Sequence, residues 1–201
     1  MRVLHSVTEA EVIATFLRAE LDSPRYGDTI RELLAADGRD VSLIARPDVG
    51  NSDDNAYRDS LLERYRGWTS RIGLFNGFPH DVAWSRVALR RDEVLSILYI
   101  DWDWWLRISG GTRRPRDAAR RIRAGEIPGA TAEPEEPLAA RLAATEKPPE
   151  LIAVAPPDHT KLVLLEGHLR LTAYALFPSY LPAELEIYLG VSDEIEAWSE
   201  F

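Results

Sequence analysis

Apolar residues recur at the spacing of a helix in the first part of the chain. Four large apolar side chains between Val12 and Leu17 lie one, three or four positions apart, which places them on one face of a helix. The preceding sequence T-E-A-E is a capping box, in which the Thr8 hydroxyl and the Glu11 carboxylate satisfy free backbone amides. We therefore predict a helix that ends at Leu21. Similar patterns predict helices over residues 28–38, 55–66, 92–98, 115–124 and 138–144.

Shorter apolar runs predict strands. Residues 41–44 form a brief apolar run that favours a strand, and residues 82–89 alternate between apolar and polar side chains. Later in the chain, residues 151–154 and 162–165 are apolar, and residues 185–189 alternate. A helix over residues 166–176, ended by Pro178, lies between the last two of these strands.

The order of these elements predicts an α+β protein. We expect residues 1–130 to form a mainly helical region with an aromatic core and an arginine-rich helix. Residues 131–201 are expected to form a small mixed-sheet domain on which that region packs. Residues 127–137 contain three prolines and three glutamates, a composition typical of a linker.

Seven aromatic residues fall between positions 75 and 105, and two interpretations are open for them. They form either a hydrophobic core between the two halves or a platform on which nucleobases stack. Asp101 and Asp103 alternate with the tryptophans and would repel a nucleic-acid backbone, so the core is favoured. The seven residues are Phe75, Phe78, Trp84, Tyr99, Trp102, Trp104 and Trp105.

The composition excludes several kinds of chemistry. The chain has no cysteine, which excludes disulfides, iron–sulfur clusters and thiol catalysis. Its four histidines are too far apart for a local metal motif. No apolar run is long enough to span a bilayer, and the first residues lack the apolar segment of a secretory signal. We therefore expect a soluble cytoplasmic protein with no membrane partner.

The charge is unevenly distributed. Residues 1–132 hold 20 acidic and 20 basic residues, so the net charge of −9 comes entirely from residues 133–201. Because duplex binding normally needs a basic surface, a nucleic-acid partner is not expected. Residues 113–123 are the exception, since six of these eleven are arginine. They either pair with the acidic part of the same chain or bind an anion, and nucleic-acid binding through them is a third possibility.

The strand, glycine and helix at residues 162–176 predict an anion site. Gly167 allows a ligand to approach the backbone, and the free amides at the start of the helix face a negative group. Arg170 can hold a phosphate with two hydrogen bonds, and His168 can donate a hydrogen bond or a proton.

These residues also carry a resemblance to a known superfamily. A predicted helix is followed by P-P-E-L-I-A-V, L-V-L-L-E-G-H-L-R-L-T-A-Y-A-L and L-P-A-E-L-E-I-Y-L, and this order resembles the ParB/sulfiredoxin superfamily over residues 138–190. The corresponding loop is G-E-R-R in the partition proteins, where it holds CTP, and G-C-H-R in the sulfiredoxins, where it holds ATP. It is D-G-H-H-R in the free-serine kinases, the most similar group: Gly167, His168 and Arg170 match directly, and Glu166 stands for the acid.

Two departures limit what the resemblance implies. Leu169 replaces a second histidine or arginine of the relatives, which removes one phosphate contact. His168 occupies the position of the sulfiredoxin cysteine, so sulfiredoxin chemistry is excluded. Chromosome partitioning is not expected either, because only about a dozen residues follow the last predicted strand. Two segments of the first 130 residues resemble uncharacterised bacterial proteins and imply no activity. They are G-L-F-N-G-F-P-H-D-V-A-W and S-G-G-T-R-R-P-R-D-A-A.

The leading hypothesis is a nucleotide-dependent enzyme: a phosphotransferase or ATPase that uses ATP or another nucleotide and acts on a small hydroxylated metabolite. Glu166 would bind Mg²⁺ or accept the substrate proton, and His168 would contact the phosphate or substrate. A glycine loop before the arginine-rich helix would supply a second anion site. The alternative is a non-catalytic regulatory or interaction protein that senses a nucleotide or binds a protein or nucleic acid. The predicted phosphate-binding residues are Gly167, His168, Arg170, Thr172, Gly110, Gly111, Thr112, Arg113 and Arg116.

Overall fold

A computed structural model describes residues 1–132, 135–145 and 150–201 of the chain. It has an α+β fold, as predicted, with one mixed five-stranded sheet in the order β1-β2-β5-β3-β4. The strands are β1 (Arg2–Ser6), β2 (Ala83–Arg90), β3 (Ile152–Ala155), β4 (Val163–Glu166) and β5 (Glu184–Val191). β3 and β5 run parallel, and the other neighbouring strands run antiparallel.

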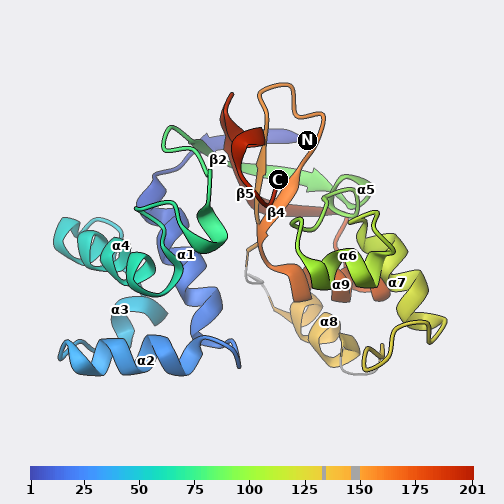
Figure 1. The fold of residues 1–201 in the computed structure, drawn as a ribbon, viewed down its shortest axis with the longest axis horizontal. Helices are drawn as coiled ribbons and strands as arrows, with labels where there is room; N and C mark the ends of the chain where they lie inside the picture. Colours follow the sequence, from blue (N-terminus) through green and yellow to red (C-terminus); the bar gives the residue numbers. More distant parts are fainter. Residues whose placement is uncertain (133–134, 146–149) are drawn as a thin grey trace.

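Helices cover both faces of this sheet (Figure 1). On one face lie α1 (Glu9–Leu21), α2 (Gly27–Ala36), α3 (Ser42–Ala45) and α4 (Ser52–Arg66). On the other lie α5 (Arg91–Val94), α6 (Asp103–Ser109), α7 (Pro115–Arg123), α8 (Glu135–Ala144) and α9 (His168–Leu176). Each helical layer buries its own hydrophobic core against the sheet.

The alternation of side chains along the strands creates these two cores. In β3, Ile152 and Val154 belong to the core under α1 and α4, whereas Ala153 and Ala155 belong to the core under α7 and α9. Every side chain of this strand is buried. Because helices cover both faces of the sheet, a central strand is expected to be apolar at every position.

The N-terminal helix matches its prediction. The Thr8 side chain accepts a hydrogen bond from the Glu11 amide, and the Glu11 carboxylate accepts one from the Thr8 amide. The residues predicted to be apolar on one face, including Phe16 and Leu17, are buried.

The strand prediction for residues 41–44 was wrong, because the single helical turn α3 covers Ser42–Ala45. The Asp40 carboxylate accepts a hydrogen bond from the Ser42 amide and starts the turn, and Ile44 fills the core beneath α1. The helix predicted over residues 92–98 is also shorter than expected. It ends at Val94, because Leu98 instead exchanges backbone hydrogen bonds with Leu162 and Leu164 beside β4.

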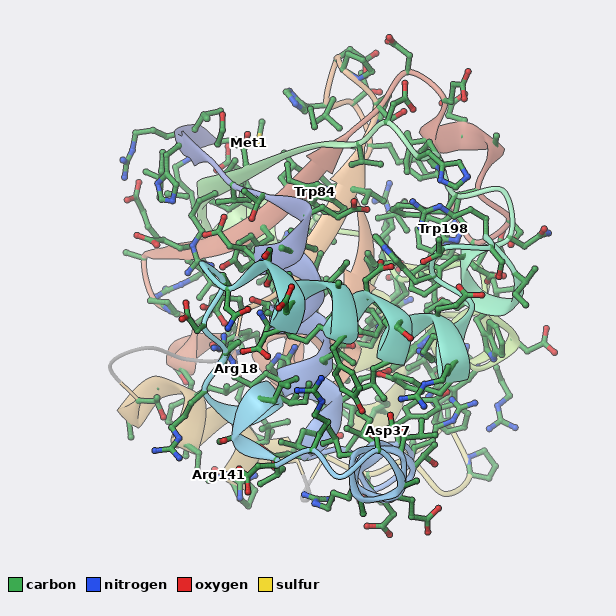
Figure 2. The ribbon with its side chains drawn as sticks, turned by 90° about the vertical axis from the view of Figure 1, so that its left-hand side faces the viewer. Met1, Arg18, Asp37, Trp84, Arg141 and Trp198 are labelled. Carbon is green, nitrogen blue, oxygen red and sulfur yellow. The ribbon has the colours of Figure 1, made fainter. Side chains whose placement is uncertain are left out.

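The aromatic cluster is mostly core. Phe75, Phe78, Trp84 and Tyr99 are buried, and Trp105 is partly buried against both cores. Figure 2, which views the side covered by α1 to α4, shows Trp84 on the sheet and Trp198 in the C-terminal segment. Trp102 and Trp104 remain 42% and 37% exposed at the start of α6, so the prediction that they are core residues was wrong.

The sheet takes strands from both sides of the predicted domain boundary at residue 130. β2 precedes the boundary, and it pairs along its whole length with β5, which follows it. The predicted linker over residues 127–137 includes residues 133–134, which lie outside the described part of the chain, and its last residues belong to α8. Among the described residues, no helix is long and apolar enough to cross a bilayer.

Candidate functional site

The candidate site is built around the junction of β4 and α9. β4 ends at Glu166, and α9 begins immediately after Gly167, whose φ of 108° is left-handed. A Cβ at this position would clash with Leu151 Cδ2 and crowd the Arg170 guanidinium. Glycine therefore lets the chain turn sharply from strand to helix. The amides of the first turn of α9 have no partner inside the helix and carry the positive end of its dipole.

Arg170 folds back over this glycine. Its Nη2 donates to the Glu166 carboxylate and to the Glu150 carbonyl, each at 3.0 Å. Its Nε is buried and has no hydrogen-bond partner among the described residues. The guanidinium thus secures the strand–helix junction and still offers one free donor.

His168 lies at the first position of α9, in a stack of rings. Its imidazole stacks on Trp105 with ring centroids 4.8 Å apart, and Trp105 stacks on Tyr99 at 4.7 Å. Burial, and then the charges of Arg170 and Arg66, lower the pKa of His168 to about 3. The imidazole is therefore neutral near neutral pH, and Nε2 is buried without a partner in the described structure.

The helical layer of α1 and α4 supplies the opposite side of the site. Glu20, near the end of α1, accepts hydrogen bonds from the Tyr65 hydroxyl at 2.5 Å and pairs with Arg66 Nη2 at 3.0 Å. Arg66 also donates to the Tyr26 hydroxyl at 2.6 Å, while its Nε is buried and unpartnered among the described residues. Burial raises the pKa of Glu20 to about 7, and the nearby Glu166 charge contributes in the same direction.

A second carboxylate network adjoins the site through Glu150. Its two oxygens lie 3.0 Å from Arg18 Nη2 and 3.5 Å from Arg86 Nη1. Because the Glu150 carbonyl also accepts from Arg170, this network is continuous with the start of α9. Four arginines (18, 66, 86 and 170) and three glutamates (20, 150 and 166) therefore meet between the two helical layers, and Arg86 Nε also pairs with the exposed Glu186 at 3.2 Å.

Thr172, predicted to bind phosphate, lies inside the fold. Its hydroxyl donates to the His168 carbonyl at 2.8 Å and accepts from the Tyr99 hydroxyl at 2.7 Å. Only 4% of this residue is exposed. Thr172 therefore holds Tyr99 and the ring stack in place.

The loop at residues 110–113 also has internal contacts. Gly110 ends α6 in the left-handed conformation, Gly111 also has a positive φ, and Thr112 donates to Asp117 at 2.8 Å. The Arg113 guanidinium donates to the carbonyls of Tyr99, Glu200 and Phe201 at 2.7–3.0 Å. The predicted second phosphate loop is not brought to the start of α9 through Arg113, because that side chain is held by backbone carbonyls.

Arg116 lies near the C-terminal end of α9, whereas the site lies at its N-terminal end. It pairs with Asp92 at 2.8 Å and lines a surface depression together with Ala175 and Pro178, at the C-terminal end of α9. A helix of this length spans about 13 Å. The predicted site residues that the structure brings together are therefore Glu166, Gly167, His168 and Arg170.

The contribution of α1 and α4 was not predicted. One sequence signal exists for Glu20: it follows Phe16 by four positions and Leu17 by three, and so lies on the buried face of its helix. A carboxylate in such a position marks either a buried ion pair or a functional group. No comparable signal identifies Arg66.

The residues present do not form a prepared magnesium site at Glu166. Its Oε1 is engaged by Arg170 at 3.0 Å. Within residues 1–132, 135–145 and 150–201, no three histidine, aspartate or glutamate side chains gather to hold a metal ion.

Comparison with protein-family models, curated proteins and solved structures finds no match to this chain. The site must therefore be interpreted from its own geometry.

Proposed function

We propose that the start of α9 binds the phosphate groups of a nucleotide, and that the protein is a nucleotide-dependent phosphotransferase or ATPase. One observation carries the proposal: Nε2 of His168 and the Nε atoms of Arg66 and Arg170 are buried without partners in the described structure. Buried polar atoms are nearly always hydrogen-bonded. We infer a ligand here because these three nitrogens gather in one place, whereas Arg58 Nε and Arg71 Nε, which also lack partners among the described residues, lie in other parts of the fold. Phosphate oxygens accept hydrogen bonds from such donors.

The local charge supports an anionic ligand. Four arginines face four glutamates around the site, the fourth being Glu186 beside Arg86, and Glu20, with a pKa of about 7, is only partly ionised near neutral pH. Partial protonation of Glu20 therefore leaves the site with a small excess of positive charge, within a chain whose net charge is −9. The amides and dipole of α9 add to this preference.

The reaction proposed is transfer of a phosphoryl group to a hydroxyl of a small metabolite, or to water. The hydroxyl oxygen forms a bond to the terminal phosphorus as the bond to the leaving nucleoside diphosphate breaks, and the hydroxyl proton passes to Oε2 of Glu166, the oxygen that Arg170 does not engage. Neutral His168 donates a hydrogen bond to the phosphate, and the arginines stabilise its charge. No step is assigned to Mg²⁺, since Glu166 is held by Arg170.

Binding is tested by the melting temperature in the presence of ATP, ADP, CTP or GTP, each with and without Mg²⁺. A ligand that binds the native state raises the melting temperature by mass action. We expect one nucleotide to do so in the wild-type protein. If none does, the nucleotide proposal is wrong.

Two conservative variants test whether the nucleotide binds at the start of α9. His168→Phe keeps an aromatic ring against Trp105 but has no nitrogen, and Arg66→Lys keeps the charge beside Glu20 but has no Nε. Each should reduce the nucleotide-dependent shift. Arg64→Lys is the matched control, because Arg64 lies on the same helix but pairs with Asp37. An equal loss in this control would contradict the assignment.

The alternative function is a regulatory protein that binds a nucleotide without consuming it. The contacts of Arg170 with Glu166 and Glu150 favour this alternative, because they leave Glu166 paired. Turnover separates the two: an enzyme releases phosphate or a phosphorylated product, whereas a sensor leaves the bound nucleotide intact.

A further inference from the structure

A shallow basic depression of about 350 Å³ lies far from the start of α9, between α5, α7 and the C-terminal end of α9. Leu95, Ala119 and Ala175 are buried side chains at its base. Its rim carries four arginines and one acidic residue. These are Arg91, Arg116, Arg120, Arg123 and Asp92.

The arginines of α7 are regularly spaced along one side of the helix. Arg116, Arg120 and Arg123 are separated by four and three positions, so they form a row along one face about 10 Å long. A second depression, lined by Arg90, Arg91, Asp92 and Ala183, adjoins the first and extends the row. The result is a basic stripe rather than a single anion site.

Among the described residues, the acidic segment 133–201 does not neutralise the arginines of this stripe. Arg116 pairs with Asp92 and Arg120 with Asp117, both acids of the first 130 residues. These pairs are exposed: the side chains of Arg116 and Arg120 are 57% and 73% accessible. Exposed pairs contribute little free energy, so a partner can replace them readily.

We propose that this stripe docks an acidic amphipathic segment of a partner protein. Carboxylates spaced three or four residues apart on a helix match the spacing of Arg116, Arg120 and Arg123, and apolar side chains between them fit the depression. Single-stranded nucleic acid is disfavoured, because none of the described residues lining either depression is aromatic and bases would have no stacking surface.

The test is fluorescence anisotropy with a labelled amphipathic peptide that carries glutamates at four-residue spacing and leucines between them. We expect binding at low ionic strength that weakens as salt is added. The triple variant Arg116→Gln, Arg120→Gln and Arg123→Gln should weaken binding by about tenfold or more. Because all three side chains are exposed, its melting temperature should match that of the wild-type protein.

The control is a second triple variant with the same net charge. Arg25→Gln, Arg39→Gln and Arg46→Gln removes three exposed arginines from the other helical layer and should leave peptide binding unchanged. An equal loss in both variants, or no peptide binding at low salt, overturns the proposal. Tighter binding of labelled single- or double-stranded DNA than of the peptide also overturns it, in favour of a nucleic-acid surface.

Discussion

Arg170 shows how one side chain can serve both the fold and a site. Its Nη2 joins the end of β4 to the segment before β3, through Glu166 and the Glu150 carbonyl, and its Nε points to no protein acceptor in the described residues. The motif around Gly167 predicted a phosphate clamp. The structure adds a structural contact that the motif alone does not indicate.

Arg170→Ala should therefore destabilise the protein even without a ligand. The variant leaves the Glu150 carbonyl and the half-buried Glu166 carboxylate without their donor, and an unsatisfied buried polar group costs about 1–3 kcal/mol. Urea unfolding should show a loss of this size. Arg141→Ala is the control, since Arg141 is an exposed residue of α8. Unchanged stability in Arg170→Ala would show that these hydrogen bonds contribute nothing to folding.

Glu20 should make stability depend on pH. Burial raises its pKa to about 7 in the folded protein, whereas an unfolded glutamate titrates near 4.3. The folded state therefore binds more protons between these values, and the contribution of Glu20 to stability falls as the pH rises through this window.

The measurement is the free energy of unfolding of the wild-type protein and of Glu20→Gln between pH 5 and pH 8, a range chosen to bracket a pKa of about 7. Glutamine can accept the Tyr65 hydrogen bond without ionising. The wild-type protein should lose stability relative to the variant as the pH rises. Parallel curves would contradict the raised pKa.

At the scale of single elements, the junction of β4 and α9 depends on one backbone conformation. Gly167 has a φ of 108°, which side-chain-bearing residues rarely adopt. It also brings Leu151 against its Cα. The orientation of the whole of α9, and so of His168 and Arg170, follows from this residue.

Gly167→Ala should destabilise the fold by about 1–3 kcal/mol, because the strained backbone and the contact with Leu151 add together. Gly38→Ala is the matched control, since Gly38 also has a positive φ but has no neighbouring atom where a Cβ would lie. Thermal unfolding of both variants separates the cost of the strained backbone from the cost of the contact with Leu151. A loss for Gly167→Ala no larger than that for Gly38→Ala would show that Leu151 moves aside without cost.

The sequence predicted the long amphipathic helices and the strands of the second half, and failed where tertiary contacts decide. α1 was predictable because its cap and its apolar face agree. β1 was missed because it is an edge strand with largely exposed side chains, so its sequence does not alternate. α3 was mistaken for a strand because a four-residue run with three apolar side chains does not distinguish the two structures.

The site was predictable only in part, because local sequence patterns do not show tertiary contacts. Glu166, Gly167, His168 and Arg170 lie within five consecutive residues, so their sequence order already implies their proximity. Glu20 and Arg66 reach the site only because α1 and α4 pack on the opposite face of the sheet. No local pattern can show that they meet.

At the scale of the whole molecule, Arg113 joins segments that are far apart in sequence. It is 8% exposed, and its guanidinium donates to the carbonyls of Tyr99, Glu200 and Phe201. These bonds hold the C-terminal segment against the turn that precedes α7. Arg113 thus connects Tyr99, before α6, to the last two residues of the sequence.

Arg113→Ala should lower stability by about 3 kcal/mol or more, because hydrogen bonds from a charged donor contribute about 1.5–3 kcal/mol each and three are lost. Its neighbour provides the control: Arg114 is exposed, so Arg114→Ala should leave the midpoint of urea unfolding nearly unchanged. Similar midpoints for the two variants would show that the C-terminal segment is held by other contacts.

The pairing of β2 with β5 has a consequence for synthesis in the cell. Arg86 lies opposite Tyr188, so the two strands are separated by about a hundred residues of chain. At a typical elongation rate, β2 leaves the ribosome roughly 5–20 seconds before β5 does. During this interval one edge of β2 is open to pairing with other chains. The nascent protein is thus most exposed to aggregation before β5 is made, and chaperones that shield open strand edges would act on it in that interval.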